Sequence, residues 1–397
     1  MSKSADGAPR KPRKSATSVV HAGRDPQAHH GFVNPPVYRG STVLFPSLAT
    51  LEAKDRPFTY GRRGTPTVKA LEQAMTEIEG GAACRLTASG YQAVTTAILA
   101  FAEAGDHILV ADSVYQPTRQ FCDQMLKNLG VETTYYDPLT GGQIAGLVRA
   151  NTRLVFTESP GSQTMEVQDI PAISGVAKSR GLWLIVDNTW ATPLFFKPFD
   201  HGADVSIQAA TKYIVGHADA MLGAIISNAR AAKQVERASG LLGVCPGSEE
   251  TFLGLRGLRT LDVRLERHQR SGLEIARWLE GRPEVSCVLH PALPSHPGHA
   301  IWKRDFTGAS GLFSIILKPA PRAAIAAMLD GLELFGMGYS WGGYESLVLP
   351  FDPTSYRTAT RWTAEGQALR FHIGLDDVGD LQRDLEAGFA RLRKSAG

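Results

Sequence analysis

Asp204-Val-Ser-Ile-Gln-Ala-Ala-Thr-Lys-Tyr-Ile-Val-Gly-His-Ala-Asp219 is the segment from which the interpretation of this chain starts. It opens as a buried strand, because Val205 and Ile207 are apolar, and both strand and helix periodicity stop at Ala209-Ala210. Lys212 therefore follows directly after a strand end. A lysine amine can condense with an aldehyde when it is partly desolvated or near another cation. Taken alone, these residues favour the simpler alternative, a lysine that buries its stem and keeps its amine in water.

A carboxylate upstream gives Lys212 a chemical context. The apolar run Leu182-Trp-Leu-Ile-Val186 predicts a strand buried on both faces, and it ends in Asp187-Asn-Thr. A carboxylate at that position can pair with the ring nitrogen of pyridoxal phosphate, keep it protonated and let the ring accept electrons. Lys212 and Asp187 together therefore suggest a lysine-bound pyridoxal phosphate. Without Lys212, a helix cap or a turn would explain Asp187 better.

Two further segments suit the same cofactor. Residues Cys84–Val94 lead from a short strand through Ser89-Gly90 into a helix expected to run to about Gly105. Free N–H groups at this helix start form an anion site suited to the cofactor phosphate, although such helix starts are common. Tyr115 follows a strand over 107–111, and its ring could stack on a flat cofactor or equally well belong to the core.

Six motifs in one order extend this interpretation to a family. They are Tyr60-Gly-Arg62, Ser89-Gly90, Tyr115, Asp187-Asn-Thr, Thr211-Lys212-Tyr and Ser340-Trp-Gly-Gly-Tyr-Glu-Ser346. This set resembles the Cys/Met-metabolism group of pyridoxal-phosphate enzymes from Thr17 onward, and within that group it is most similar to the bacterial cystathionine β-lyases. The resemblance implies fold type I: an α/β protein with a large, mostly parallel seven-stranded sheet domain and a smaller C-terminal α+β domain. It also implies a cytoplasmic homotetramer built as a dimer of dimers.

The resemblance further implies a set of site residues. Lys212 and Tyr115 would be catalytic. The residues that bind the cofactor would be Tyr60, Arg62, Ser89, Gly90, Tyr91, Tyr115, Asp187, Thr211 and Lys212, and those that bind the substrate would be Tyr60, Ser340, Trp341 and Arg370. Tyr60 and Arg62 would reach the cofactor phosphate of the neighbouring subunit, where a guanidinium suits phosphate oxygens, so that no monomer has a complete site. By their local sequence alone they are polar residues of a solvated turn.

Length and composition are those of an ordinary globular enzyme. A chain of 397 residues can bury a large core and divide into two or three lobes. The hydrophobic share of 43% and the charged share of 20% are typical of soluble enzymes. No apolar run approaches the roughly 20 residues of a membrane span. Four widely spaced cysteines without a Cys-x-x-Cys pair predict the reduced thiols of a cytosolic protein.

Positive charge is concentrated at the amino terminus. The formal charge of the chain is +3, but residues 1–16 hold five basic residues against one acidic residue, a local +4 that leaves −1 for the remainder. The body therefore lacks the basicity of a nucleic-acid-binding protein. We expect residues 1–16 to be a disordered leader, with a transit peptide as the alternative.

The remaining pattern divides the chain into three parts: a flexible tail and, from residue 17, an extended arm (1–60), a large cofactor-binding domain (61–258) and a C-terminal domain (259–397). The middle part alternates apolar runs with helical periods, which predicts a parallel sheet that binds ligands beyond the carboxyl ends of its strands. A helix is expected over 251–279. Strands are expected over residues 82–86, 107–111, 132–136, 152–157, 182–186, 204–208, 223–227, 311–317, 346–349 and 368–372.

Two segments of the third part bear on ligands. His290-Pro-Ala-Leu-Pro-Ser-His-Pro-Gly-His299 holds three histidines, but its prolines predict an irregular surface loop without a nearby thiolate, and we expect no metal there. Arg370 lies within an apolar strand, where an unpaired cation would be costly. A bidentate carboxylate would relieve that cost, and the resemblance implies the α-carboxylate of the substrate. The alternative is a structural ion pair with an acidic residue of the protein.

The resemblance implies α,β-elimination of L-cystathionine to homocysteine, pyruvate and ammonia in methionine biosynthesis, with L-cystine or cysteine as further substrates. Trp341 and Ala209 stand where related γ-enzymes tend to carry leucine and serine, which favours the β-lyase branch. Gly240 and Gln116 depart from the familiar β-lyases, which carry tyrosine and glutamate, and so affect recognition of the distal end of cystathionine. The alternatives are a cystathionine γ-synthase, γ-lyase or sulfhydrylase, and a non-catalytic regulator with the same fold. Neither nucleic acid nor membrane is an expected partner.

Overall fold

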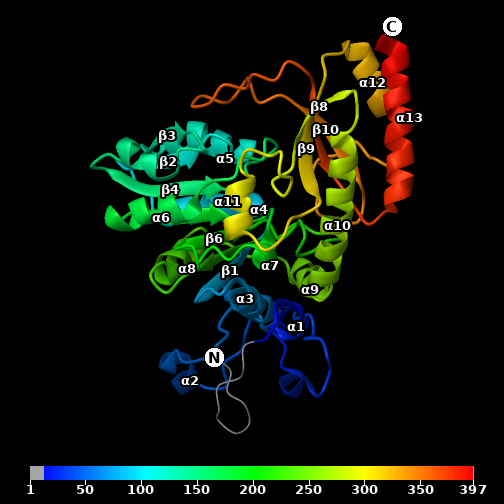
Figure 1. Ribbon diagram of the computed structural model, residues 1–397. Helices are drawn as coiled ribbons and strands as arrows, with labels where there is room; N and C mark the ends of the chain where they lie inside the picture. The colour runs from blue at the N-terminus through cyan, green and yellow to red at the C-terminus, as the bar shows by residue number, and fades with distance from the viewer. Residues whose placement is uncertain (1–12, 397) are drawn as a thin grey trace.

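Seven strands form the larger of two sheets in the computed structural model, which describes residues 13–396 (Figure 1). They are β1 (Ala83–Thr87), β2 (His107–Ala111), β3 (Glu132–Tyr136), β4 (Thr152–Glu158), β5 (Trp183–Asp187), β6 (Val205–Gln208) and β7 (Gly223–Ser227). Their order is β1-β7-β6-β5-β4-β2-β3. Only the pairs that involve β7 are antiparallel. The expected mostly parallel sheet of seven strands is confirmed.

Alternation along these strands divides the core into two layers. On β7, Ile225 packs with one apolar cluster, whereas its neighbours Ala224 and Ile226 pack with another on the opposite face. Helices cover both faces, as a parallel sheet requires. They are α3 (Pro66–Glu79), α4 (Gly90–Leu99), α5 (Gln116–Gln120), α6 (Ile170–Ser179), α7 (Thr192–Phe195) and α8 (Ala232–Leu241), and the chain also forms a π-helix at Phe121–Leu126 and 3-10 helices at Gly61–Arg63 and Gly141–Leu147.

One helix is shorter than expected. The helix after Ser89 was predicted to run to about Gly105, but α4 ends at Leu99. The chain leaves the helix because the N–H groups of Phe101 and Ala102 both donate to the Ile98 carbonyl, which closes the last turn. The Asp106 carboxylate then accepts the Glu103 N–H at 2.9 Å and shapes the loop that leads into β2.

The long helix predicted over 251–279 is two helices, α9 (Ser248–Leu258) and α10 (Leu261–Glu280). Thr260 leaves helical geometry with φ −110° and ψ 9°. Its hydroxyl donates to the Gly257 carbonyl, a local bond that competes with the helical one. Arg259 lies at this break, and its Nη1 donates hydrogen bonds to the carbonyls of Val19 and Ala22, each at 2.8 Å.

A second, fully antiparallel sheet has the order β10-β11-β9-β8 and lies at the right of Figure 1. Its strands are β8 (Val285–Leu289), β9 (Leu312–Leu317), β10 (Leu347–Phe351) and β11 (Ala368–His372), and its helices are α12 (Arg322–Asp330) and α13 (Val378–Ala396). The helix α11 (His299–Asp305) follows β8 in the chain, but it packs against the core of the larger sheet through Ile301 and Trp302. The sheet and the helices α10, α12 and α13 share one apolar core. The expected smaller α+β unit is confirmed, and β8 is a strand that the sequence pattern did not predict.

The segment between β10 and β11 reaches back to the larger sheet, as the orange excursion in Figure 1 shows. The N–H and hydroxyl of Thr360 donate to the buried Asp112 carboxylate at 2.8 and 2.7 Å. Arg357 pairs with Glu166 at 2.6 Å. The excursion therefore anchors the loop that follows β2, which also carries Tyr115.

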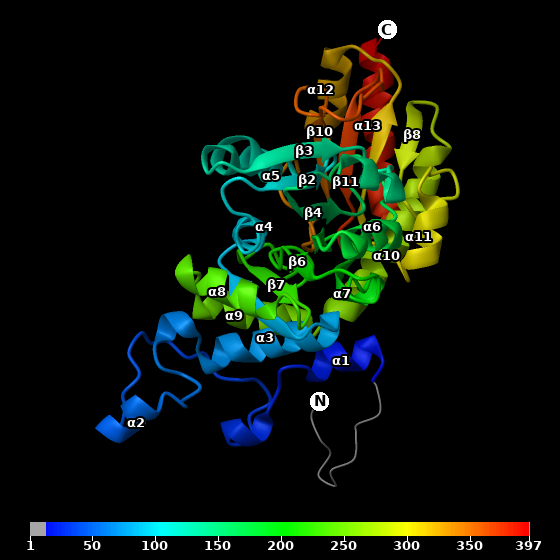
Figure 2. The ribbon, with the colours of Figure 1, turned by 90° about the vertical axis from the view of Figure 1, so that its left-hand side faces the viewer.

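The amino-terminal region differs from the expected extended arm. It contains α1 (Ser15–His21), a 3-10 turn at Pro26–His29 and α2 (Leu48–Ala53). Val19 of α1 is fully buried in the core that includes α3, so this part of the arm is packed rather than extended. Figure 2 shows α1 and α3 side by side below the sheet. Of the predicted disordered leader, residues 1–12 lie outside the described range, and the three-part division of the chain stays a prediction.

Two simple features complete the description. Within residues 13–396, no helix combines the length and the apolar character needed to cross a bilayer. All four cysteines are free thiols: Cys84 and Cys122 are buried, and Cys245 and Cys287 are exposed.

Candidate active site

Lys212 lies at the centre of the candidate site, in the turn that follows β6. Its amine donates a hydrogen bond to the Ser340 hydroxyl at 2.6 Å and lies 5.3 Å from the centre of the Trp341 ring. These two residues come from the loop before β10. The structure therefore brings together three predicted site residues that come from distant parts of the sequence.

The environment of Lys212 makes its neutral amine accessible. The pKa of Lys212 is lowered from 10.5 to about 8, mainly by burial and also by the nearby charge of Arg370, while the Asp187 carboxylate opposes both effects. A lysine with such a pKa can act as a nucleophile or a base near neutral pH. The charges that act on its pKa also show that Asp187 and Arg370 face the same site.

Asp187 closes β5 and is buried. Its Oδ1 accepts hydrogen bonds from the Thr189 N–H and hydroxyl at 3.0 and 2.5 Å, and the same hydroxyl accepts the Ala209 N–H at 2.9 Å. Burial raises the pKa of Asp187, while the bonds from Thr189 and the charge of Lys212 lower it. A buried carboxylate held in this way suits a protonated ring nitrogen.

The start of α4 packs directly against the segment that leads to Lys212. Ser89 caps the helix by accepting the Gln92 N–H at 3.1 Å, and a Cβ on Gly90 would stand only 2.4 Å from the Cβ of Ala209. Within residues 13–396, the N–H groups of Gly90 and Tyr91 donate to no other group. Such free donors at a helix start form an anion site. Together with Lys212 and Asp187, this cradle fits pyridoxal phosphate.

Tyr115 stands at the rim of the site with 47% of its surface exposed. Its N–H donates to the Glu158 carboxylate at 2.7 Å. Burial and the charge of Glu158 raise the pKa of Tyr115, while Arg370 lowers it and Asp187 raises it. The exposed ring leaves room for a stacking partner, and the role of Tyr115 stays a prediction.

Glu158 is a site residue that the sequence analysis missed. It ends β4, pairs in register with Asp187 on β5, and its pKa is raised well above the ordinary value by burial and by the Asp187 charge. The sequence contained the pattern that could have identified Glu158, because this residue ends an apolar strand just as Asp187 does. Two carboxylates therefore stand side by side at the carboxyl ends of neighbouring strands.

Arg370 on β11 points its guanidinium into the site from the smaller sheet. Its Nη2 donates to the Ser340 carbonyl at 3.0 Å, and among the described residues it forms no ion pair with a carboxylate. Burial lowers its pKa to about 10. The alternative of a structural ion pair therefore finds no partner within residues 13–396, and Nε of Arg370 is buried without a hydrogen bond there.

The loop that carries Ser340 and Trp341 has an unusual backbone. Ser340 has φ +78° and Gly342 has φ +87°, and residues other than glycine rarely adopt this region of backbone angles. A Cβ on Gly342 would also lie 2.9 to 3.0 Å from backbone atoms of Lys212. Glycine at 342 therefore permits both the turn and the close approach of this loop to Lys212.

Three predicted residues lie apart from this group or are already engaged. Arg62 donates to the Gly240 carbonyl at 3.3 Å and lines a hollow of about 540 Å³ with Gly240. Tyr60 forms an isolated bridge with Thr42 in the arm. The Thr211 hydroxyl donates to the Leu222 carbonyl at 3.0 Å. The contribution of Tyr60 and Arg62 to a neighbouring subunit's site stays a prediction.

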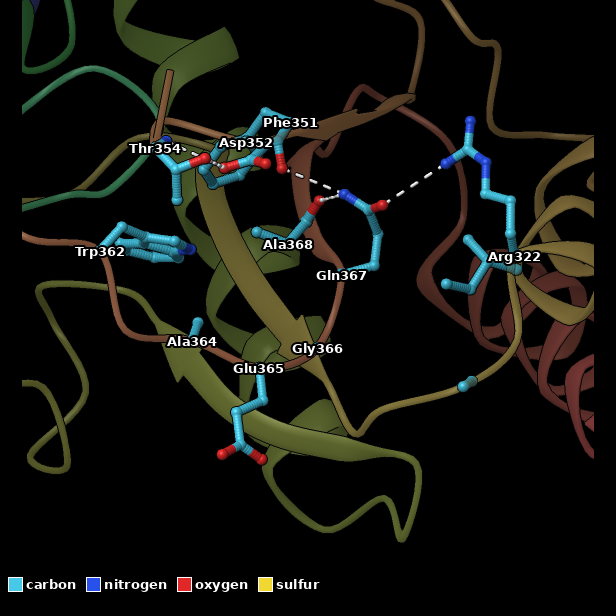
Figure 3. A pocket seen from close by; sticks show the side chains of 12 residues that line it. Arg322, Phe351, Asp352, Thr354, Trp362, Ala364, Glu365, Gly366, Gln367 and Ala368 are labelled. Carbon is cyan, nitrogen blue, oxygen red and sulfur yellow. Dashed lines mark hydrogen bonds between the residues drawn. The ribbon is translucent and has the colours of Figure 1, made fainter. Parts of the chain in front are cut away.

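A second hollow, of about 340 Å³, lies beside β10 and β11 (Figure 3). Gln367 donates to the carbonyls of Phe351 and Ala368 at 3.1 and 3.0 Å and accepts from Arg322 at 3.5 Å. Thr354 donates to Asp352. Gln367, Arg322 and Thr354 thus bond to other groups of the lining, and the hollow contains none of the predicted site residues.

The three histidines of the 290–299 segment form hydrogen bonds with backbone groups of the same segment. Nδ1 of His290 accepts the Ala292 N–H, and Nδ1 of His296 accepts the Gly298 N–H. Nδ1 of His299 donates to the Pro291 carbonyl. In the described part of the chain, no group of three metal-ligating side chains gathers here or elsewhere.

Comparisons with known proteins agree with this geometry. The model of the family "Cys/Met metabolism PLP-dependent enzyme" matches residues 16–390. The chain is 53% identical to a putative cystathionine beta-lyase of Rhizobium johnstonii, over 94% of this chain and 95% of that protein. It is 47% identical to a cystathionine beta-lyase of Escherichia coli, over 96% of this chain and 99% of that protein.

A solved structure extends the agreement to three dimensions. The cystathionine gamma synthase of Xanthomonas oryzae pv. oryzae, in complex with aminoacrylate and cysteine, matches with a TM-score of 0.88 at 33% identity, over 97% of this chain and 100% of that chain. The family model spans nearly the whole chain, and the folded chain gathers a lysine, a carboxylate and an anion cradle that suit one cofactor. This protein therefore belongs to the Cys/Met metabolism family of PLP-dependent enzymes.

Proposed function

We propose that this protein is a cystathionine β-lyase, a carbon–sulfur lyase that converts L-cystathionine and water to homocysteine, pyruvate and ammonia in methionine biosynthesis. The observation that carries the chemistry is the Lys212 amine, whose lowered pKa leaves it available as a base near the buried Asp187 and near Arg370, which forms no ion pair within residues 13–396. The choice of substrate is supported by the cystathionine beta-lyases that align over nearly the full chain. L-Cystine and cysteine are proposed as further substrates.

The cofactor would be held by groups that surround Lys212. Asp187 would pair with the ring nitrogen, the N–H groups of Gly90 and Tyr91 with Ser89 would bind the phosphate beside Thr211, and the ring of Tyr115 would stack on the pyridine. Bound pyridoxal phosphate supplies the aldehyde that attaches the substrate amine and a ring that accepts electrons.

The remaining steps belong to the chain's own residues. Arg370 would bind the α-carboxylate with its planar guanidinium, and Ser340 and Trp341 would border the substrate. Lys212 Nζ would take the proton from Cα. The Cβ–S bond then breaks with its electron pair leaving on sulfur, and the proton held at Nζ can return to that sulfur to give homocysteine. Water converts the three-carbon remainder to pyruvate and ammonia.

We further propose that the enzyme works as a cytoplasmic homotetramer in which Tyr60 and Arg62 complete the neighbouring site. Large apolar residues of the amino-terminal arm are exposed, which is typical of a surface covered by another chain: Phe32, Val33, Leu44, Leu48 and Leu51. The free thiols support a reducing compartment.

Supplying L-cystathionine and assaying pyruvate, homocysteine, 2-oxobutyrate and cysteine together tests the reaction. A β-lyase releases pyruvate and homocysteine in equal amounts, and Lys212→Ala should lower that release by roughly 1000-fold or more. Release of 2-oxobutyrate and cysteine would instead assign a γ-lyase. If cystathionine yields neither keto acid, and the protein instead consumes an activated homoserine together with cysteine in a separate assay, the protein is a transferase. A purified protein without the yellow colour of the cofactor would indicate a non-catalytic relative.

A further inference from the structure

Glu79 is a buried carboxyl group that the proposed mechanism does not use. It is the last residue of α3, and 1% of its surface is exposed. A polar group in such a place is costly unless hydrogen bonds satisfy it, and a charged group is more costly still. The groups that surround Glu79 therefore determine what it does for the fold and for the site.

Three side chains from the ends of two neighbouring strands donate hydrogen bonds to Glu79. Its Oε1 accepts from Ser206 Oγ at 2.5 Å, from Asn188 Nδ2 at 3.0 Å and from Gln208 Nε2 at 3.3 Å. Ser206 and Gln208 are alternate residues of β6 and share one face of that strand. Asn188 directly follows β5, which pairs with β6. Glu79 therefore bridges the carboxyl ends of β5 and β6.

Backbone carbonyl groups set the orientation of both amides. Nδ2 of Asn188 also lies 3.3 and 3.1 Å from the carbonyl oxygens of Thr192 and Phe196, and Nε2 of Gln208 lies 3.2 Å from the Asn188 carbonyl oxygen. A carbonyl oxygen can only accept, so both amides present their NH2 groups and Glu79 is the acceptor. This orientation leaves Asn188 Oδ1 without a partner in residues 13–396, but the reverse would place that oxygen against three acceptors.

The bridge adjoins both residues on which the cofactor site depends. Asp187 is held from one side by the Thr189 hydroxyl at 2.5 Å, and the next residue, Asn188, is held from the other side by Glu79. On the neighbouring strand, β6 ends four residues before Lys212. Loss of the acceptor at Glu79 would therefore act on the two strand ends that set the spacing of Asp187 and Lys212.

We propose that Glu79 is a positioning residue of the cofactor site: its acceptor oxygen ties the ends of β5 and β6 together and so fixes Asp187 at its distance from Lys212. This spacing would set the pairing of Asp187 with the ring nitrogen of the cofactor. Glu79 itself forms hydrogen bonds to Ser206, Asn188 and Gln208 only, and it acts through them. The effect on turnover rests on the proposed function, whereas the spacing of Asp187 and Lys212 does not.

The charge environment is compatible with an acceptor in this place. The pKa of Glu79 is raised, mainly by burial, while its three hydrogen-bond donors and the charge of Lys197 oppose this effect. The bridge requires an acceptor oxygen and no particular charge, because the amide N–H groups can donate to a neutral carboxyl group as well as to a carboxylate. A glutamine at position 79 could therefore keep the bridge, and a leucine could not.

The position of Asp187 can be measured through Lys212 without turnover. Burial and the charge of Arg370 lower the pKa of Lys212, whereas the Asp187 carboxylate raises it. In Glu79→Leu the acetylation profile of Lys212 in the cofactor-free protein, followed by peptide mapping, should move to lower pH by about 0.3 pH units or more, because a less firmly held carboxylate favours the charged amine less. Glu79→Gln, which keeps an acceptor oxygen, should return the profile to that of the wild-type protein.

Glu72→Leu is the matched control. Glu72 lies on the same helix, is also buried, and pairs with Arg85 of β1 at 3.2 Å instead of with a residue of β5 or β6. This variant should lower the free energy of unfolding and leave the Lys212 profile unchanged. Should Glu79→Leu fail to fold, Gln208→Leu removes the bonds to Glu79 and to the Asn188 carbonyl from the β6 side and should give the same shift.

The protein with bound cofactor gives a second measurement. Glu79→Leu should raise the dissociation constant of pyridoxal phosphate by roughly tenfold, because Asp187 is then less well placed for the charge-assisted hydrogen bond to the ring nitrogen. It should also lower kcat/KM on cystathionine by roughly 10- to 100-fold, since misplacement of a catalytic group by about 1 Å has effects of that order. Glu79→Gln should recover most of both losses.

Three results would overturn the proposal: an unshifted Lys212 profile in folded Glu79→Leu, the same shift in Glu72→Leu, or equal effects of Glu79→Leu and Glu79→Gln. The first two would leave Glu79 with a role in stability only, and the third would show that its acceptor oxygen is not what matters. If the wild-type protein fails to cleave cystathionine, the proposed function fails, while the Lys212 profile and the cofactor affinity still decide this inference.

Discussion

The Lys212 amine and the Ser340 hydroxyl are 2.6 Å apart although 128 positions separate the two residues in the chain. The lysine follows a strand of the larger sheet, and the serine precedes a strand of the smaller one. The active site therefore depends on the contact between the turn after β6 and the loop before β10, which belong to different sheets. Changes on the smaller sheet should alter the chemistry of a lysine on the larger one.

The reactivity of Lys212 should rise at lower pH than that of an ordinary lysine. With its pKa near 8, about half of the amine is neutral at pH 8, whereas an ordinary lysine near 10.4 is then about 0.4% neutral. Acetylation of the cofactor-free protein at a series of pH values, followed by peptide mapping, measures this. Labelling of Lys212 that rises only near pH 10 would contradict the prediction.

The same pKa has a consequence for stability. Because the folded pKa lies below the unfolded one, the unfolded chain binds more protons between about pH 8 and 10.4, so the contribution of Lys212 to folding stability increases as pH rises through that window. The variant Lys212→Met should lack this increase in urea titrations of the cofactor-free protein.

Replacing Arg370 should affect both substrate binding and Lys212. Arg370→Leu should lower kcat/KM by roughly 100-fold or more, mostly through KM, because the α-carboxylate loses its guanidinium partner. Loss of this cation should also shift the acetylation profile of Lys212 to higher pH, since the charge of Arg370 lowers the pKa of Lys212. Arg370→Lys should recover only part of the binding. Arg322→Leu, at the hollow of Figure 3, is the control and should leave both measurements unchanged.

Gly342→Ala should destabilise the folded protein. The new methyl group would lie 2.9 to 3.0 Å from Lys212 atoms at a residue with φ +87°. We expect a loss of about 2 to 4 kcal/mol in the free energy of unfolding, together with lower activity, since the loop must move away from Lys212. Gly175→Ala in the middle of α6, where nothing lies within 4 Å of the added Cβ, should be neutral or stabilise by up to about 1 kcal/mol.

Glu158 should act as a neutral acceptor that holds Tyr115. Its pKa is raised by burial and by Asp187, so Glu158→Gln, which still accepts the Tyr115 N–H, should retain most activity. Glu158→Leu should lower kcat/KM by roughly tenfold, because a buried N–H loses its partner and Tyr115 shifts. Large and equal losses in both variants would show that a charged Glu158 is required.

The raised pKa also gives a stability test. The native state binds a proton at Glu158 that the unfolded chain releases above about pH 4.3, so this contribution to stability is present below that pH and is lost as pH rises through the folded pKa. Glu158→Gln should remove that loss from a series of denaturant titrations at pH 5 to 9.

Local patterns were sufficient for the larger sheet. Continuous apolar runs such as His107–Ala111 and Gly223–Ser227 predicted strands because burial on both faces leaves a local signature. Asp187 and Lys212 were predicted as site residues because each follows or ends such a run. The break between α9 and α10 was missed, since it depends on the Thr260 hydroxyl and on contacts of Arg259 with α1. Strand β8 was missed because Ser286 and Cys287 at its centre are both exposed, which interrupts the alternation.

Residue types and their spacing along the chain were enough to indicate a lysine, a carboxylate and an anion site for one cofactor, because each is a property of a single strand end or helix start. The partners across the site were settled only by folding. Glu158 beside Asp187 arises from the register of β4 and β5, and Ser340 against Lys212 arises from the contact between the loop before β10 and the turn after β6. A linear pattern records which residues are buried, and it does not record which distant residues meet there.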